Sequence, residues 1–306
     1  MKKFVITIIA SALLGGCVQQ STLPATPVKS LTSSEIIAST TDEQWRWVDP
    51  ENILKLTLPT GAAYIELNPA LAPKHSANIK KLARQGFYQG THIYRFVEGF
   101  VAQGGDSTGK KLTKTKNSTV PAEFYLTTNE PLRITEMGGD GYAPITGFLN
   151  GFAVAQNETR DQTWQIHCHG VFAMARGNDI NSASTEFFVT IGQGPRYLDK
   201  NITVFGRVLT GMAHFHQLAR TPEGGSDFNP ITDLQVLADV SSDSSRFKVM
   251  KTDSDAFKQL ISARGSRSEE WFAYSHNYIG VCGMPVPTKQ LNIFLISYKV
   301  AAAAED

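Results

Sequence analysis

Hydrophobic and polar residues alternate in short runs through the middle of the chain, and this period of two predicts β-strands. Two such runs, residues 53–58 and 62–67, flank a Pro-Thr-Gly turn and predict a hairpin. Further strands are expected at residues 91–101 (a pair interrupted at Gly99), 187–191, 202–205 and 234–240. Helical spacing in this region is limited to residues 74–85 and 211–220. Many short strands with two helices favour a closed β-barrel, because closure removes exposed strand edges.

Two regions differ in composition from this pattern. Residues 106–170 are rich in glycine and polar residues, and we interpret about 107–169 as an insertion folded onto the barrel. Residues 241–306 are expected to form a C-terminal extension with a helix at 254–264, and Trp271 and Phe272 are expected to pack on the main body. The sequence therefore predicts one main domain, at residues 44–240, that carries both additions.

The N-terminus has the pattern of a bacterial lipoprotein signal. Two lysines precede an apolar run at residues 4–14 that is too short to span a bilayer. The run ends in Leu-Gly-Gly-Cys, which resembles a lipobox, so we expect a signal peptide at 1–16 and acylation of Cys17. Because Val18 follows instead of aspartate, the resemblance points to the periplasmic side of the outer membrane of a Gram-negative bacterium. Residues 17–43, rich in Ser, Thr, Pro and Gln, are expected to form a flexible tether.

Charge, cysteine content and the absence of ligand motifs limit the partners and cofactors that the chain is expected to bind. The chain has 29 Lys and Arg against 28 Asp and Glu, so no basic face predicts a nucleic-acid partner. Besides Cys17, the cysteines are Cys168 and Cys282, and an oxidising periplasm permits a disulfide between them. His167 and His169 flank Cys168, but no second ligand pair follows at zinc-site spacing, so no metal site is expected. The sequence has no phosphate-loop or dinucleotide motif, and we expect no cofactor.

Three blocks of sequence carry a family resemblance. Residues 94–106, Tyr-Arg-Phe-Val-Glu-Gly-Phe-Val-Ala-Gln-Gly-Gly-Asp, place phenylalanine five and glutamine eight positions after an arginine. Residues 172–188 contain Phe-Ala-Met-Ala-Arg-Gly and end in Phe-Phe, and residues 197–208 contain Tyr-Leu-Asp and Val-Phe-Gly-Arg-Val. In this order the blocks resemble the cyclophilin family over residues 53–240. The resemblance implies a closed eight-stranded β-barrel with two capping helices and peptidyl-prolyl cis/trans isomerase activity.

The resemblance also implies that Arg95 is the catalytic residue, and arginine suits the reaction chemically. Rotation about an X–Pro bond breaks amide resonance, with a barrier of roughly 18–20 kcal/mol, and leaves a lone pair on the proline nitrogen. A guanidinium beside that nitrogen stabilises the twisted amide more than the planar one. Gln103 is expected to bind the substrate backbone, and Ala175 matches a position that holds the substrate like a neighbouring strand.

Further matched positions imply an apolar slot for the proline ring. The residues that correspond to its walls are Phe100, Val101, Phe188 and Leu198. Val101 stands where the family usually has methionine. The substrate-facing positions that depart from the usual glutamine, tryptophan and histidine are Glu186, Tyr197 and Ile202. We therefore expect a pocket that accepts proline, is slightly wider at Val101 and binds cyclosporin poorly.

The expected partners are proline-containing segments of unfolded or secreted proteins, and the membrane through the lipid anchor. The joint presence of Arg95, Phe100, Gln103 and Phe188 favours an active folding enzyme. The departures at Val101 and Glu186, together with the insertion, leave open two alternatives. These are a non-catalytic module that binds proline peptides and a structural lipoprotein of the envelope.

Overall fold

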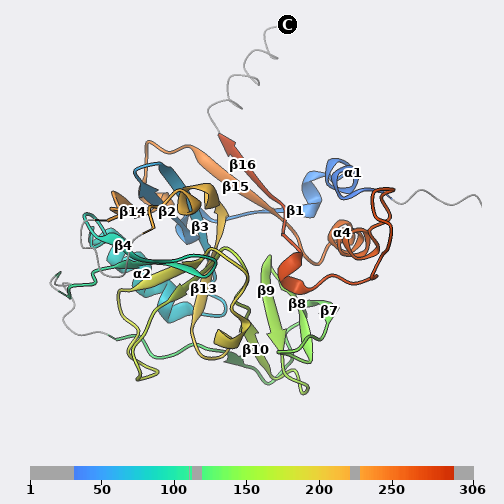
Figure 1. Ribbon diagram of the computed structural model, residues 1–306, viewed down its shortest axis with the longest axis horizontal. Helices are drawn as coiled ribbons and strands as arrows, with labels where there is room; N and C mark the ends of the chain where they lie inside the picture. The colour runs from blue at the N-terminus through green and yellow to red at the C-terminus, as the bar shows by residue number, and fades with distance from the viewer. Residues whose placement is uncertain (1–30, 110, 112–118, 221–227, 293–306) are drawn as a thin grey trace, which may run out of the picture. The chain divides into compact units, whose positions relative to one another are not determined.

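The computed structural model describes residues 31–109, 111, 119–220 and 228–292 (Figure 1). The expected signal peptide, Cys17 and the first part of the expected tether lie outside these ranges. The described residues belong to one unit, which contains one large and two smaller antiparallel sheets. Within these ranges no helix is both long enough and apolar enough to cross a membrane.

The largest sheet has eight strands in the order β14-β2-β3-β13-β11-β12-β5-β4. Its members are β2 (Ile53–Leu58), β3 (Gly61–Leu67), β4 (His92–Val97), β5 (Val101–Gly105), β11 (Val171–Met174), β12 (Phe187–Thr190), β13 (Val204–Thr210) and β14 (Asp233–Val236). The predicted hairpin is confirmed as β2 and β3. The sheet curls, and an isolated bridge near its two edges joins His92 to Pro230. The mainly β architecture is as predicted. The edge strands β14 and β4 are not paired with each other in a ladder, so the sheet is curled and its predicted closure is limited to this one bridge.

Two helices pack on the large sheet at the predicted places. They are α2 (Pro73–Arg84) and α3 (Met212–His216). The first buries Ile79 and Leu82, and the second buries Phe215. These side chains join Phe172 of β11, Phe187 of β12 and Phe205 of β13 in one hydrophobic core. Full burial of such a side chain contributes about 1.5–3 kcal/mol, so this core fixes the strands that carry the site.

The insertion contains its own five-stranded sheet, in the order β6-β10-β9-β8-β7. Its members are β6 (Leu126–Thr127), β7 (Thr135–Gly138), β8 (Ile145–Leu149), β9 (Phe152–Gln156) and β10 (Gln162–Gln165). Asn150 and Gly151 connect β8 to β9 with φ values of 50° and 89°. Two successive residues with positive φ match the twist of a two-residue hairpin turn, for which Asn-Gly is preferred.

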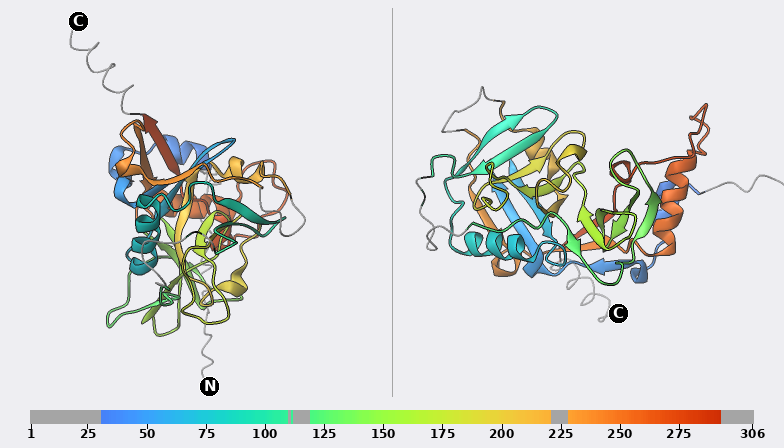
Figure 2. Two further views of the ribbon diagram at one scale, coloured as in Figure 1. Left: turned by 90° about the vertical axis from the view of Figure 1, so that its left-hand side faces the viewer. Right: turned by 90° about the horizontal axis from the view of Figure 1, so that it is seen from below.

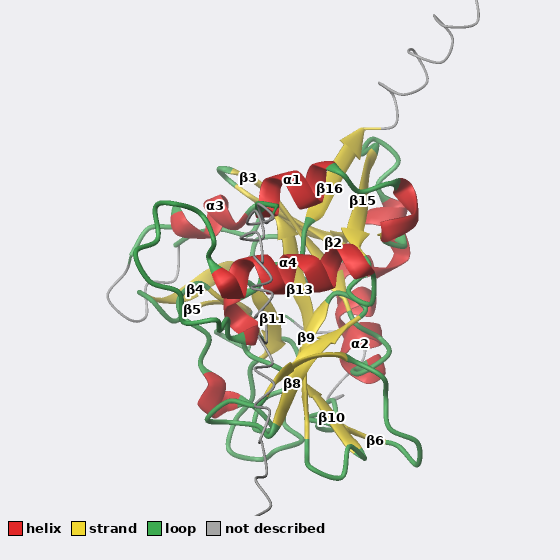
Figure 3. Ribbon diagram, turned by 90° about the vertical axis from the view of Figure 1, so that its right-hand side faces the viewer, coloured by secondary structure: helices red, strands yellow, loops and turns green. Residues whose placement is uncertain are grey.

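Segments from before and after the large sheet form the third sheet, in the order β1-β15-β16. Its strands are β1 (Trp45–Trp47), β15 (Ser245–Met250) and β16 (Thr288–Asn292). Helix α1 (Ser33–Ala38) lies beside α4 (Asp255–Ser266), as Figure 3 shows. The right view of Figure 2 shows α4 beside the insertion sheet, where the rings of Phe148 and Phe257 meet edge to face with centroids 5.2 Å apart.

Two expectations for these flanking segments need correction. Helix α1 lies within the range expected to be tether, because Thr32 and Glu35 form a capping box and Ile36 is buried at 3% exposure. Trp271, which was expected to pack on the main body, is 84% exposed. The ring contact it makes is with the neighbouring Phe272, edge to face with centroids 4.9 Å apart.

Candidate active site

Strands β4 and β5 bring together the two polar residues of the predicted site. Arg95 and Gln103 are cross-strand partners, and Arg95 Nη1 donates a hydrogen bond to Gln103 Oε1 at 3.2 Å. Gln103 Nε2 donates to Tyr94 Oη at 2.6 Å. Among the described residues no carboxylate pairs with Arg95, whose side chain is partly exposed. Hydrogen bonds therefore fix both the oxygen and the nitrogen of the Gln103 amide. The guanidinium of Arg95 has further N–H groups that can donate to a ligand.

The apolar residues of the predicted site gather beside this pair. Phe188 lies opposite Gln103 in the β5–β12 ladder, so both side chains are on one face of the sheet. Phe188 and Val101 are buried at 5% and 2% exposure. The partly buried residues in the same hydrophobic cluster include Phe100, Ala175, Leu198 and Ile202. Tyr197 is 62% exposed and stacks on Phe100 with ring centroids 6.5 Å apart.

Glu186 occupies the position next to β12 and reaches across to β5. The backbone N–H of Ala175 donates to the carbonyl of Glu186 at 2.7 Å. Burial raises the pKa of the Glu186 carboxyl, and hydrogen bonds from the Tyr94 hydroxyl and the Asp106 backbone partly oppose this shift. A Cβ at Gly105 would stand 2.5 Å from both carboxylate oxygens, so glycine is required for this packing. Glu186 is thus connected to the polar pair through Tyr94.

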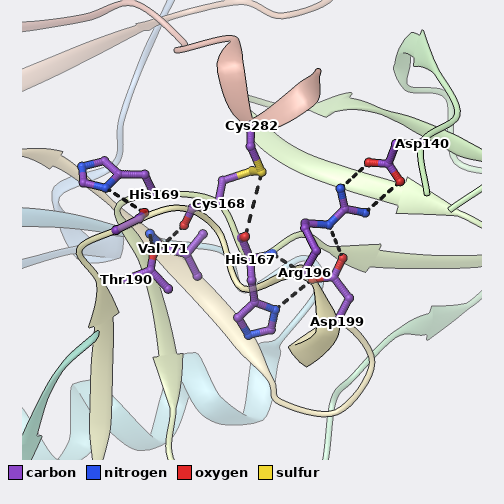
Figure 4. The surroundings of a disulfide bond; sticks show 10 residues. Asp140, His167, Cys168, His169, Val171, Thr190, Arg196, Asp199 and Cys282 are labelled. Atoms are coloured by element: carbon purple, nitrogen blue, oxygen red, sulfur yellow. Dashed lines mark hydrogen bonds and ion pairs between the residues drawn. A yellow bond between two sulfur atoms is a disulfide. The ribbon is translucent and has the colours of Figure 1, made fainter. Parts of the chain in front are cut away.

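Two residues at the site were not assigned a role there from sequence, namely Tyr94 and His167. Burial raises the pKa of Tyr94, and the nearby charge of Glu186 adds to the effect. His167 is fully buried, and its ring stacks on Phe188 with centroids 6.3 Å apart. Its Nδ1 lies 2.9 Å from Oδ1 of Asp199 (Figure 4). The histidine therefore supports one wall of the apolar cluster.

A charged network continues from Asp199 to the insertion. Arg196 Nε donates to Asp199 Oδ2 at 2.6 Å, and the other end of the guanidinium pairs with Asp140. Arg196 begins η3 (Arg196–Leu198), the short helix that carries two of the predicted pocket residues. Because Asp140 belongs to the insertion, this ion pair fixes η3 from outside the large sheet, as Figure 4 shows.

The predicted disulfide is present next to this network. Cys168 and Cys282 are joined with a Cα–Cα distance of 5.1 Å. Cys168 follows His167 in the chain, and Cys282 lies in η5 (Val281–Gly283) of the C-terminal extension. The bond therefore fastens the extension to the segment just before β11.

Comparison with known sequences decides the family. A sequence profile described as "Cyclophilin type peptidyl-prolyl cis-trans isomerase/CLD" matches residues 53–238. The chain belongs to the cyclophilin family. A probable peptidyl-prolyl cis-trans isomerase of Brucella suis is 32% identical over 184 residues, which cover 60% of this chain and 80% of that protein. The human peptidyl-prolyl cis-trans isomerase-like 1 is 28% identical over 192 residues, covering 62% and 92% of the two chains.

A solved structure extends the likeness beyond the profile match. Cyclophilin AquaCyp293 from Hirschia baltica has a TM-score of 0.69 and 29% sequence identity, covering 86% of this chain and 98% of its own. That coverage is larger than residues 53–238, so it includes parts of the flanking segments of this cyclophilin. This cyclophilin is a peptidyl-prolyl cis-trans isomerase.

Changing Glu186→Gln is expected to raise the free energy of unfolding at pH 7 by about 1 kcal/mol. Because burial raises the pKa of Glu186, the folded state holds this proton more tightly than the unfolded state does. Stability is therefore lost as the pH rises from the ordinary carboxyl value of 4.5 through the raised pKa. The amide has nearly the same shape and cannot ionise.

Urea denaturation between pH 4 and pH 8 measures this effect. The gain from Glu186→Gln is expected to vanish as the pH falls below 4.5, where the wild-type carboxyl is protonated in both states. Glu130→Gln, at an exposed carboxylate, is the matched control and should change nothing. An equal gain at every pH would show that ionisation of Glu186 is not the cause.

Proposed function

We propose that this cyclophilin accelerates rotation about X–Pro bonds through the guanidinium of Arg95. The observation that carries the proposal is the 3.2 Å hydrogen bond from Arg95 to Gln103 beside the apolar cluster of Phe188. In the twisted amide the proline nitrogen leaves conjugation and becomes a hydrogen-bond acceptor. A donor from Arg95 is gained there and is absent in the planar ground state, so it lowers the barrier.

The neighbouring side chains fit the remaining parts of an X–Pro substrate. The proline ring would pack against Phe100, Phe188 and Leu198, which lie in one cluster. The amide nitrogen of Gln103 has two hydrogens and uses one on Tyr94, so the other can donate to a substrate carbonyl. Val101 lies in the same cluster and is smaller than the methionine usual in the family, which leaves the slot slightly wider.

An isomerase assay on proline tetrapeptides tests this proposal. Both a protease-coupled assay and a protease-free one should show acceleration that scales with enzyme concentration. Refolding of a protein limited by prolyl isomerisation should accelerate as well, because that reaction takes tens to hundreds of seconds unaided. Binding of the same peptides without acceleration would support a binding module and contradict catalysis by Arg95.

We also propose that the clients are proline-containing segments of unfolded or secreted proteins at the periplasmic face of the outer membrane. The lipobox-like Leu-Gly-Gly-Cys at residues 14–17 supports this location. The disulfide between Cys168 and Cys282 also supports it, because such bonds persist in oxidising compartments.

Changing Cys17→Ser is expected to release the protein from membranes or to leave it unprocessed. Each buried methylene of an acyl chain contributes about 0.8 kcal/mol to membrane binding, so loss of all acyl chains removes the anchor. Membrane fractionation and the intact mass of the mature N-terminus measure the outcome. Gln19→Ala is the control and should stay in the membrane fraction. A Cys17→Ser protein that remains there with the native N-terminus would contradict the proposal.

A further inference from the structure

A cavity of about 300 Å³ lies where the insertion, the large sheet and the C-terminal extension meet. Most of its lining is apolar and comes from all three parts. Representative lining residues are Phe148, Phe152, Val171, Leu209, Val281 and Val286. Arg95, Phe100, Gln103 and Phe188 do not line it, although Phe188 and several lining residues belong to the same hydrophobic cluster. The volume is at the lower end of the roughly 300–1,000 Å³ range of small-molecule sites.

Positive charge is in excess at one wall of this cavity. Arg207 lines the cavity, and its Nη2 lies 2.9 Å from an oxygen of Glu66. The other oxygen of Glu66 lies 2.6 Å from Nη2 of Arg46. Two guanidinium groups therefore share one carboxylate that is 3% exposed. Among the described residues neither arginine has a second carboxylate partner.

The excess charge lies beside the cavity, with Arg207 in its lining and Arg46 behind Gly151. Gly151 lines the cavity, and a Cβ at that position would stand 3.1 Å from Nη2 of both Arg207 and Arg46. The other contacts of the pair are neutral. Arg46 Nη2 donates to the carbonyl of Asn150 at 2.6 Å, and Arg207 lies over the ring of Phe152 at 5.2 Å. A second anion at this wall would bring the cluster to electrical balance.

We propose that this cavity binds an amphipathic monoanion, a carboxylate with a single medium-length hydrocarbon chain, whose head group lies at Arg207. The side chains of Arg46 and Arg207 are partly withdrawn from solvent, at 24% and 15% exposure. A carboxylate forms strong charge-assisted hydrogen bonds with arginine, and these strengthen as water is excluded. Burial and the nearby charge of Arg46 lower the pKa of Arg207 in spite of its ion pair with Glu66. The apolar lining suits the hydrocarbon chain, and the small volume suits a single medium-length chain instead of a two-chain lipid.

Calorimetric titration with sodium decanoate, below its micelle concentration, tests the proposal. The full chain would carry Cys17→Ser so that no acyl group of its own competes. Decanoate is expected to bind saturably at one site. Decanol and decyltrimethylammonium, which have the same chain without the negative charge, are expected to bind at least about tenfold more weakly. Absence of saturable decanoate binding, or equal binding of the cationic amphiphile, would overturn the proposal.

Two variants test separately whether binding needs the positive charge of Arg207 and the volume of the cavity. Arg207→Met leaves Arg46 and Glu66 as a balanced pair and is expected to weaken decanoate binding at least about tenfold. Ala153→Phe fills the cavity from β9, keeps both arginines and is expected to abolish binding. Arg220→Met, at an exposed arginine paired with Glu98, is the control and should bind as the wild type does. Thermal melting without ligand identifies folded variants, and unchanged binding in folded Ala153→Phe would refute the site even if Arg207→Met does not fold.

Discussion

Replacing Arg95 with alanine is expected to lower kcat/KM for X–Pro isomerisation by about two to three orders of magnitude. Loss of one preorganised donor that acts in the transition state typically has an effect of this size. The free energy of unfolding should change by less than about 1 kcal/mol, because the side chain is partly exposed and has no carboxylate partner among the described residues. Arg95→Lys should recover only part of the activity, since an ammonium lacks the planar fork that meets Gln103.

Isomerase kinetics and thermal melting of the same preparations measure both effects. Arg133→Ala is the matched control, because Arg133 is exposed and lies in the insertion. It should leave kcat/KM and the melting temperature unchanged. A folded Arg95→Ala protein with wild-type activity would show that the catalytic donor lies elsewhere. A loss of activity with a parallel loss of stability would show a structural role for Arg95.

The sequence alone predicted the parts of the fold that depend on local pattern. The β2–β3 hairpin follows from alternation around a turn, and α2 follows from helical spacing after a proline. Arg95 and Gln103 were predicted from the resemblance of residues 94–106 to the cyclophilin signature. Their hydrogen bond depends on the register of β4 and β5, which only the structure gives.

Residues whose role depends on contacts between distant segments could not be assigned in this way. His167 supports Phe188 only because Asp199, 32 positions later, holds its ring. Nothing in the neighbourhood of His167 in the chain distinguishes it from an ordinary buried histidine. The strands of the insertion, in contrast, could have been predicted from sequence. Asn150-Gly151 between two hydrophobic runs is a strong signal for the β8–β9 hairpin.

The disulfide between Cys168 and Cys282 is expected to have a large effect on stability. Changing Cys168→Ala together with Cys282→Ala should lower the free energy of unfolding by about 4 kcal/mol. The two cysteines are 114 positions apart, and closing a loop of this length restricts the unfolded chain by about 4–5 kcal/mol in the chain-entropy model. Alanine is preferred to serine because Cys168 is buried and a hydroxyl there would need a hydrogen-bond partner.

Urea denaturation with and without a reducing agent measures this loss. Reduced wild type should unfold like the double variant, and the variant itself should not respond to the reducing agent. Mass spectrometry of a non-reduced digest provides the independent check. Two free thiols in the native protein, or equal stability of oxidised and reduced wild type, would contradict the prediction.

Amide hydrogen exchange of the folded double variant can show which segments open more often when the disulfide is absent. Cys282 lies in η5, which leads into β16 at one edge of the third sheet. Without the bond, no cross-link ties this edge to the segment before β11, so η5 and β16 should exchange faster than β2 and β3. Arg95 and Gln103 lie on β4 and β5, and Asp199 still holds the His167 ring beside Phe188 without the bond, so turnover below the melting temperature should be retained. Uniform loss of protection across the large sheet would instead mean that the bond acts only through the unfolded chain and that the extension opens together with this sheet.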